Sequence, residues 1–128
     1  MIVAGIGCRK GASAREIGAA IRVALSSAGL ESDALGLIAA PATKGREPGI
    51  AAAATDMGVP LVLVAQADLE AAGPRTTTRS ARVAALMGVP SAAESAALAA
   101  GGPAARLLSP RVAVGPATCA LATNEGAS

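Results

Sequence analysis

The segment from Gly5 to Glu16 holds the residues whose types and spacing are best suited to chemistry. It reads GIGCRKGASARE, in which glycines let the backbone turn sharply and bring its amides close to a ligand. Arg9 and Lys10 would meet negative charge there, and Ser13 with Glu16 has the capping-box spacing of a helix start. We therefore predict an anion-receiving turn between a strand and a helix. Its predicted ligand-binding residues are Gly7, Arg9, Lys10, Gly11 and Ser13.

Cys8 is the candidate nucleophile of this turn. A position near a helix N-terminus and beside two cations favours the thiolate form of a cysteine. The alternative is a small, partly buried residue that packs in a tight turn, and the chain has no histidine to act as its base. Both interpretations stay open. Cys119 falls in a predicted strand, where we expect it to be a core residue.

Two later segments add candidates to the same chemistry. Lys44 and Glu47 belong to the sequence KGREPG, where Glu47 would stand at a helix start and could orient a base or activate water. Glu47 is thus the second candidate catalytic residue and Lys44 a further ligand-binding residue, although helix capping and solubility explain both equally well. Ser91 and Glu94 repeat the capping-box spacing, and we include them among the predicted ligand-binding residues.

The composition excludes several classes of chemistry. The 128 residues include no Phe, Tyr, Trp or His, which removes imidazole bases, histidine metal ligands and Ser-His or Cys-His pairs. Without aromatic side chains the chain cannot stack bases, and its net charge of +2 is too small for a protein that tracks nucleic-acid phosphates. The two cysteines lack the spacing of a zinc or redox motif. We predict no metal, no cofactor and no nucleic-acid partner.

Nucleotide binding and membrane insertion are also disfavoured. Gly11 does not fall at the third position of a dinucleotide-binding fingerprint, and Lys10 is followed by Gly11 and Ala12 rather than by the serine or threonine of a phosphate loop. No apolar run approaches the ~20 residues that span a bilayer. The chain begins without the features of a signal peptide, so we expect a cytoplasmic protein with free thiols and no membrane partner.

The pattern of apolar residues indicates alternating strands and helices. The expected strands are Ile2–Ile6, Leu35–Ala39, Pro60–Ala65, Leu107–Leu108, Val112–Val114 and Thr118–Thr123. The expected helical segments are Ala14–Ala28, Pro48–Met57, Asp68–Ala72, Arg79–Met87 and Ser91–Ala100. The continuous apolar run after Pro60 suggests a central strand, and the last two strands would form a hairpin at one sheet edge.

These elements predict one α/β domain over residues 1–123, with helices on both faces of a sheet that the final hairpin makes mixed. Residues 124–128 are expected to form a frayed tail. In such sheets, ligands bind beyond the carboxyl ends of the strands. The turn after the first strand and the loop after the second would reach one rim, so Arg9, Lys10, Lys44 and Arg46 would lie together. A third group of cations, Arg75, Arg79 and Arg82, either joins such a site or is an ordinary solvated surface.

Three segments in this order resemble a known family. They are Gly5 to Gly11, Lys44 to Gly49, and Gly88-Val89-Pro90-Ser91 through Glu94 to Leu98. Together they are similar to the cobalamin-biosynthesis family that comprises CobE and the CbiG C-terminal domain, over nearly the whole chain. The joint order of the motifs makes the resemblance specific. The chain is more similar to the free-standing members of that family than to the longer CbiG proteins.

The resemblance implies a three-layer α/β/α domain with a mixed sheet and work on tetrapyrrole intermediates. In the longer proteins this domain is part of the cobalt-precorrin-5A hydrolase, which opens a ring-A δ-lactone and releases acetaldehyde. Three hypotheses follow from it. The leading one is a protein that binds or processes a polycarboxylate precorrin or corrin intermediate at the cationic turn. The others are lactone hydrolysis through Cys8 or Glu47, and a non-catalytic subunit of another cobalamin-pathway enzyme.

Overall fold

The computed structural model describes residues 1–45, 47–76, 91–108 and 111–124. The strands are β1 (Ile2–Cys8), β2 (Leu35–Pro41), β3 (Leu61–Val64), β4 (Arg106–Leu107), β5 (Val112–Val114) and β6 (Ala117–Thr123). The α-helices are α1 (Ala14–Ser27), α2 (Pro48–Met57), α3 (Gln66–Ala72) and α5 (Ala92–Gly101). Short 3-10 turns are η1 (Ser32–Ala34), η2 (Ala42–Lys44) and η3 (Gly73–Arg75).

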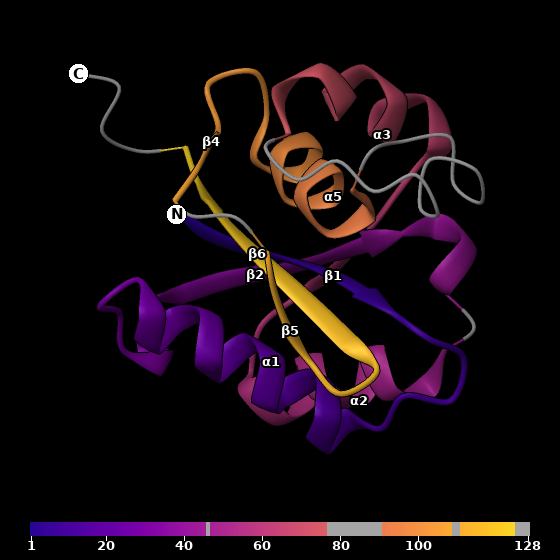
Figure 1. Cartoon of the computed structure of the whole chain (residues 1–128), viewed down its shortest axis with the longest axis vertical. Coiled ribbons are helices and arrows are strands. Elements are labelled where there is room, and N and C mark those ends of the chain that lie inside the picture. Colours follow the sequence, from indigo (N-terminus) through magenta and orange to yellow (C-terminus); the bar gives the residue numbers. More distant parts are fainter. Residues whose placement is uncertain (46, 77–90, 109–110, 125–128) are drawn as a thin grey trace.

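The strands form one mixed sheet of six strands in the order β3-β2-β1-β6-β4, with β5 also paired to β6. β1, β2 and β3 run parallel to one another, whereas β6 is antiparallel to β1. Helices α1 and α2 cover one face of the sheet, and α3 and α5 cover the other (Figure 1). The predicted three-layer α/β/α architecture with a mixed sheet is therefore confirmed.

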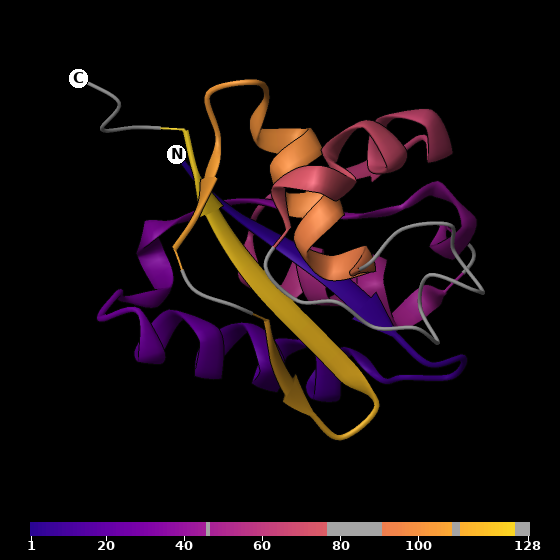
Figure 2. The ribbon, with the colours of Figure 1, turned by 45° about the horizontal axis from the view of Figure 1, so that its top comes forward.

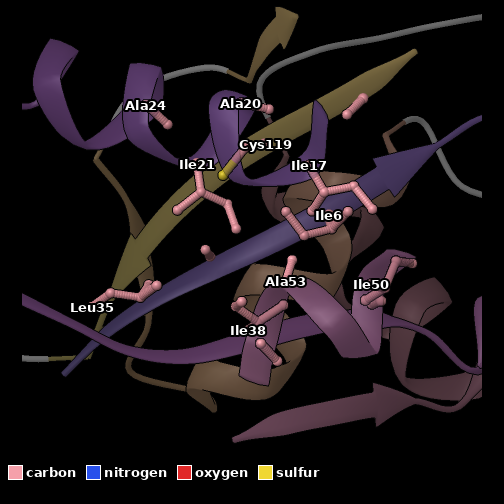
Figure 3. Close-up of a cluster of buried hydrophobic side chains, with 14 of the residues drawn as sticks. Ile6, Ile17, Ala20, Ile21, Ala24, Leu35, Ile38, Ile50, Ala53 and Cys119 are labelled. Atoms are coloured by element: carbon pink, nitrogen blue, oxygen red, sulfur yellow. The ribbon is translucent and has the colours of Figure 1, made fainter. Parts of the chain in front are cut away.

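Each face of the sheet has its own core, because successive side chains of a strand point to opposite faces. Ile6 and Ile38 pack against α1 and α2, where Cys119 also lies (Figure 3). Val3 and Leu37 pack against α3 and α5 on the other face. Small side chains dominate both clusters, which lets the layers approach closely.

Gly5 shows how close that approach is. An added Cβ at Gly5 would stand 2.0 Å from the Ala93 carbonyl oxygen and 2.7 Å from the Ala97 backbone nitrogen. Helix α5 thus lies directly on β1, and only glycine fits beneath it. We had expected Gly5 and Gly7 to serve the turn after β1, but both are strand residues, and only Gly11 in that segment has a positive φ, at 84°.

β3 differs from its predicted position. The apolar run indicated a central strand, but β3 pairs only with β2 among the described strands and forms an edge. Val62 and Leu63 are 39% and 46% exposed, while Val64 is buried. β2, β1 and β6 are the described strands with neighbours on both sides. The prediction of a central strand from local hydrophobicity is therefore wrong for β3.

The C-terminal hairpin is present, with Gly115 and Pro116 joining β5 to β6. As predicted, the hairpin lies at one edge of the sheet. β6 pairs with β1 on one side and with β4 and β5 on the other, and β5 pairs with no further described strand (Figure 2). Asn124 accepts a hydrogen bond from the Met1 amino group at 3.1 Å, so the described part of the predicted tail is attached. Residues 125–128 lie outside the described residues.

The helix predictions agree closely with the structure. The Ser13–Glu16 capping box starts α1, Pro48 begins α2, and Gly58 ends α2 with a φ of 69°. Helix α3 is longer than the single turn expected from Asp68. The predicted helix Arg79–Met87 falls outside the described residues.

Candidate functional site

The candidate site lies at the carboxyl ends of β1 and β2. The two strands are parallel neighbours, with Gly5 opposite Ala39, so the turn after Cys8 and the loop after Pro41 leave the sheet at the same edge (Figure 1). η2 follows β2 at once and carries Lys44. We call this edge, formed by residues 8–13, 42–45 and 47–49, the rim.

A hydrogen bond between Glu47 and Gly11 joins the two halves of the rim. The Gly11 amide donates to both carboxylate oxygens of Glu47, at 3.0 Å to Oε1 and 3.4 Å to Oε2. Glu47 is the N-cap residue of α2, yet its side chain makes no capping hydrogen bond within that helix. Its carboxylate is directed across the rim instead.

Gly49 fixes the distance between the two loops. A Cβ at Gly49 would stand 2.1 Å from the Ala12 carbonyl oxygen, so the first turn of α2 packs directly on the backbone that leads into α1. The KGREPG motif thus supplies an acid that reaches the turn and a glycine that lets the helix approach it. We do not predict this role of Gly49 from the sequence. The signal that could have indicated it is a glycine directly after the Glu-Pro pair that starts the helix.

Most of the turn amides expected to receive an anion already have acceptors within the chain. The Arg9 amide donates to Pro116 O at 2.9 Å, and the Ala12 amide donates to Arg9 O at 3.2 Å. The Ser13 amide donates to Glu16 Oε1 at 3.0 Å as half of the capping box. With Gly11 bound to Glu47, four turn amides have partners. Most amides of the predicted anion-receiving turn are therefore already bound by acceptors of the protein itself.

The cations of the rim, by contrast, have no acidic partner within the described ranges. Arg9 and Lys10 are exposed and Lys44 is half-buried, and none of the three forms an ion pair with another described residue. Arg46 lies outside the described residues. The rim thus presents three cations that no described carboxylate pairs with directly.

Cys8 is half-buried at the end of β1, between the two loops. Burial raises the pKa of the Cys8 thiol above its ordinary 9.0, while the positive charge of Lys44 lowers it and the negative charge of Glu47 raises it. The charges of Lys44 and Glu47 thus act on the Cys8 thiol in opposite directions. The net direction is opposite to the thiolate expectation, because burial outweighs the cation.

The N-terminus of α5 approaches the same strand end. A Cβ at Gly7 would lie 3.8 Å from the Ala93 backbone nitrogen. The first amides of a helix have no acceptor within it and carry a partial positive charge. Ser91 and Glu94 are fully buried; Ser91 Oγ accepts from the Glu94 amide at 3.4 Å, and Glu94 Oε2 accepts from the Arg111 amide at 3.0 Å. Both side chains position the helix end behind the rim.

Comparison with known proteins identifies the family. Residues 2–122 match the model of the family described as cobalamin synthesis G C-terminus. The chain belongs to this family. It is also 36% identical over 121 residues to Protein CobE of Sinorhizobium sp., covering 94% of this chain and 79% of that protein. The chain is thus a cobalamin-biosynthesis protein of the CobE and CbiG type, as the motif order predicted.

Solved structures of the family share the fold. The crystal structure of CobE, a protein from the cobalamin biosynthetic pathway, matches with a TM-score of 0.90 and 35% identity over 95% of this chain and 89% of that chain. Cobalamin biosynthesis protein chiG from Agrobacterium tumefaciens gives 0.79 and 41% over 98% and 100%. A putative cobalamin biosynthesis protein G homolog from Sulfolobus solfataricus gives 0.75 and 30%, covering 97% of this chain and 37% of that one.

Two residues of this CbiG-type domain support the site without having been predicted. Thr118 Oγ1 donates to Gly7 O at 3.1 Å, and a Cβ at Gly7 would stand 2.7 Å from Thr118 Oγ1. Pro116 O receives the Arg9 amide. Both come from the β5–β6 hairpin, more than a hundred positions away in the chain, so only the antiparallel pairing of β6 with β1 reveals them.

Arg75, from the third group of cations, does not reach the rim. Its guanidinium donates to the carbonyl oxygens of Gly102, Pro103 and Ala105, at the C-terminal end of α5. A cation beyond the C-terminal end of a helix interacts favourably with the helix dipole, and here it also binds carbonyls of the segment that follows the helix. Arg79 and Arg82 lie outside the described residues. Among the described residues, no helix is long and apolar enough to cross a membrane.

Proposed function

We propose that this protein binds a carboxylate-rich precorrin or corrin intermediate of cobalamin biosynthesis at the rim. The observation that carries the proposal is the gathering of Arg9, Lys10 and Lys44, without acidic partners among the described residues, at the sheet edge where the family motifs meet. Corrin precursors carry several carboxylate side chains around a macrocycle. Family membership supplies the pathway, and the rim supplies the matching charge.

Each rim residue has a distinct part in this proposal. Arg9 is exposed, and its planar guanidinium can pair with a carboxylate through two parallel hydrogen bonds. Lys10 and Lys44 add point charges on the two loops. Gly7 lies in the strand that leads to Arg9, Gly11 and Ser13 shape the turn after it, and Ser91 and Glu94 hold the α5 N-terminus behind it. Ligand contact then comes from cations on separate loops, as a ring with dispersed carboxylates requires.

Hydrolysis of a precorrin lactone is the competing function. Cys8 lies beside charged Lys44 and Glu47, which is the observation in its favour. However, burial raises the Cys8 pKa, the chain contains no histidine to deprotonate the thiol, and the Glu47 carboxylate is bound to the Gly11 amide. These features weaken both candidate catalytic residues and favour binding over turnover. Turnover of a lactone-bearing precorrin by wild type, with loss in Cys8→Ala, would support the enzyme.

The test of the binding proposal is a titration of hydrogenobyrinic acid followed by its visible absorption. The protein has no aromatic residue, so its own absorbance does not interfere. We expect saturable binding to wild type and about tenfold weaker binding for Arg9→Ala or Lys44→Ala, because each removes a charge-assisted hydrogen bond.

Arg22→Ala is the matched control. Arg22 is exposed on α1, away from the helix start, and forms no ion pair with a described residue, so this variant loses one positive charge without touching the rim. Equal affinity losses in all three variants would indicate only a general charge effect and would contradict the site. Absence of binding to wild type at tens of micromolar would contradict the function. Co-purification with a pathway enzyme in the absence of corrin affinity would favour the accessory-subunit alternative.

A further inference from the structure

The Glu47 carboxylate occupies an amide that the glycine-rich turn would otherwise offer to a ligand. Both of its oxygens face the Gly11 N–H, at 3.0 and 3.4 Å, which is the contact an external carboxylate would make with the same amide. Gly11 is exposed, and its hydrogen bond to Glu47 lies at the exposed surface. The amide is therefore reachable from solvent once Glu47 is displaced.

Although Glu47 lies on a rim that carries cations, its carboxylate binds a backbone amide. Lys44 lies three positions away, and its charge acts with that of Glu47 on the Cys8 sulfur. Yet no ion pair joins Glu47 to Lys44 or Arg9, and the carboxylate contacts the neutral Gly11 amide instead. The rim cations consequently stay available while the turn amide is covered.

The backbone around Glu47 holds its main chain but does not depend on its side chain. The Glu47 amide donates to Lys44 O at 3.0 Å, and the Ile50 amide donates to Glu47 O at 3.2 Å. Pro48 occupies the first helical position and has no amide to cap, and the Glu47 side chain caps no amide of α2. The side chain can therefore rotate away from Gly11 without opening the helix.

We propose that Glu47 is an internal stand-in for a ligand carboxylate, which a bound ligand displaces from the Gly11 amide. The inference rests on the proposed function, because it assumes a carboxylate ligand at the rim. It assigns Glu47 a role as a competing group rather than a catalytic acid or base. Such a group keeps the amide satisfied in the free protein and selects for ligands whose carboxylate binds the turn more strongly than Glu47 does.

The test compares Glu47→Gln with wild type in a titration of hydrogenobyrinic acid. Glutamine keeps the size and one acceptor oxygen but loses the charge, so it competes less well for the Gly11 amide and no longer repels an incoming carboxylate. We expect the variant to bind about five- to tenfold more tightly. Glu31→Gln is the control, because Glu31 is exposed before η1 and its side chain caps nothing.

The Gly11 amide resonance in ¹⁵N-labelled protein provides a readout that needs no ligand. We expect it to shift in Glu47→Gln and Glu47→Ala and to stay unchanged in Glu31→Gln. If the resonance shifts but Glu47→Gln binds the corrin equally or more weakly than wild type, Glu47 is a fixed clamp or a ligand contact and the inference is overturned. An unchanged resonance overturns it as well. If neither protein binds the corrin, the proposed function itself fails and the inference falls with it.

Discussion

At the scale of single residues, the environment of Cys8 bears on whether this side chain packs in the turn or acts as a nucleophile. The thiol is half-buried, and burial raises its pKa above 9.0 despite the nearby Lys44. Below the pKa, each further unit of increase lowers the thiolate fraction tenfold. Near neutral pH, we therefore expect Cys8 to be protonated.

This gives a signed prediction for alkylation by iodoacetamide at about pH 8. Cys8 should react more slowly than an unstructured cysteine, more slowly still in Lys44→Ala, and faster in Glu47→Gln, because Lys44 lowers its pKa and Glu47 raises it. Mass spectrometry of the peptide with Cys8 gives the rates, about two- to fivefold apart. If Cys8 in wild type is alkylated faster than free cysteine, this interpretation is wrong and Cys8 is again a candidate nucleophile.

Cys119 makes a prediction about pH and stability. It is fully buried against α1, with a pKa raised to about 12 by burial (Figure 3). Above pH 9.0, the unfolded thiol ionises while the folded one keeps its proton, so the folded state binds more protons and the free energy of unfolding falls as pH rises. The stability contribution is complete below pH 9.0 and is lost towards about pH 12.

The measurement is urea unfolding of wild type and Cys119→Ala at about pH 8, 9.5 and 10.5. The variant leaves a small cavity and should be less stable than wild type at pH 8, but this difference should shrink by up to about 1.4 kcal/mol per pH unit above 9.0. All other ionisable residues are the same in both proteins. Parallel stability curves would contradict the buried, protonated thiol.

At the scale of elements, the contact between β1 and α5 depends on the absence of a side chain at Gly5. In Gly5→Ala the new Cβ would meet backbone atoms of Ala93 and Ala97, which cannot move without displacing the helix. We expect a loss of about 3 kcal/mol in the free energy of unfolding. Because α5 also borders the strand end of the rim, corrin affinity should fall with it.

Gly36→Ala is the matched control for that substitution. Its Cβ would lie 2.7 Å from Met1 Cγ, the flexible side chain of the first residue, which can rotate away. The expected change is below about 1 kcal/mol, since alanine also reduces the entropy of the unfolded chain. Similar losses in both variants, measured by urea unfolding, would contradict the close packing of α5 on β1.

The same elements show which parts of the site could be predicted. The Ser13–Glu16 capping box and the Pro48 helix start are local patterns, and both are confirmed. The bond between Glu47 and Gly11 spans 36 positions and depends on how far two loops extend beyond parallel strands. Residue spacing indicated that the loops share an edge, but not that the acid of one would occupy the amide of the other.

At the scale of the whole molecule, the layer architecture was predictable and the strand order was not. Alternating apolar patterns indicated helices on both faces of a mixed sheet, which is confirmed. The predicted position of β3 was wrong because a short apolar run is compatible with an edge strand and with a central strand, and long-range pairing decides between the two. The family motifs remained informative because all of the described ones lie at or behind one edge of the sheet.

The central claim is that a carboxylate-rich corrin binds the rim, and chemical-shift mapping with hydrogenobyrinic acid tests it most directly. In ¹⁵N-labelled protein we expect shifts of amides in residues 8–13, 42–45 and 47–49 and at the start of α5, with Arg22 and Arg106 unaffected. Shifts at the opposite end of the sheet, or none at saturating corrin, would contradict the account.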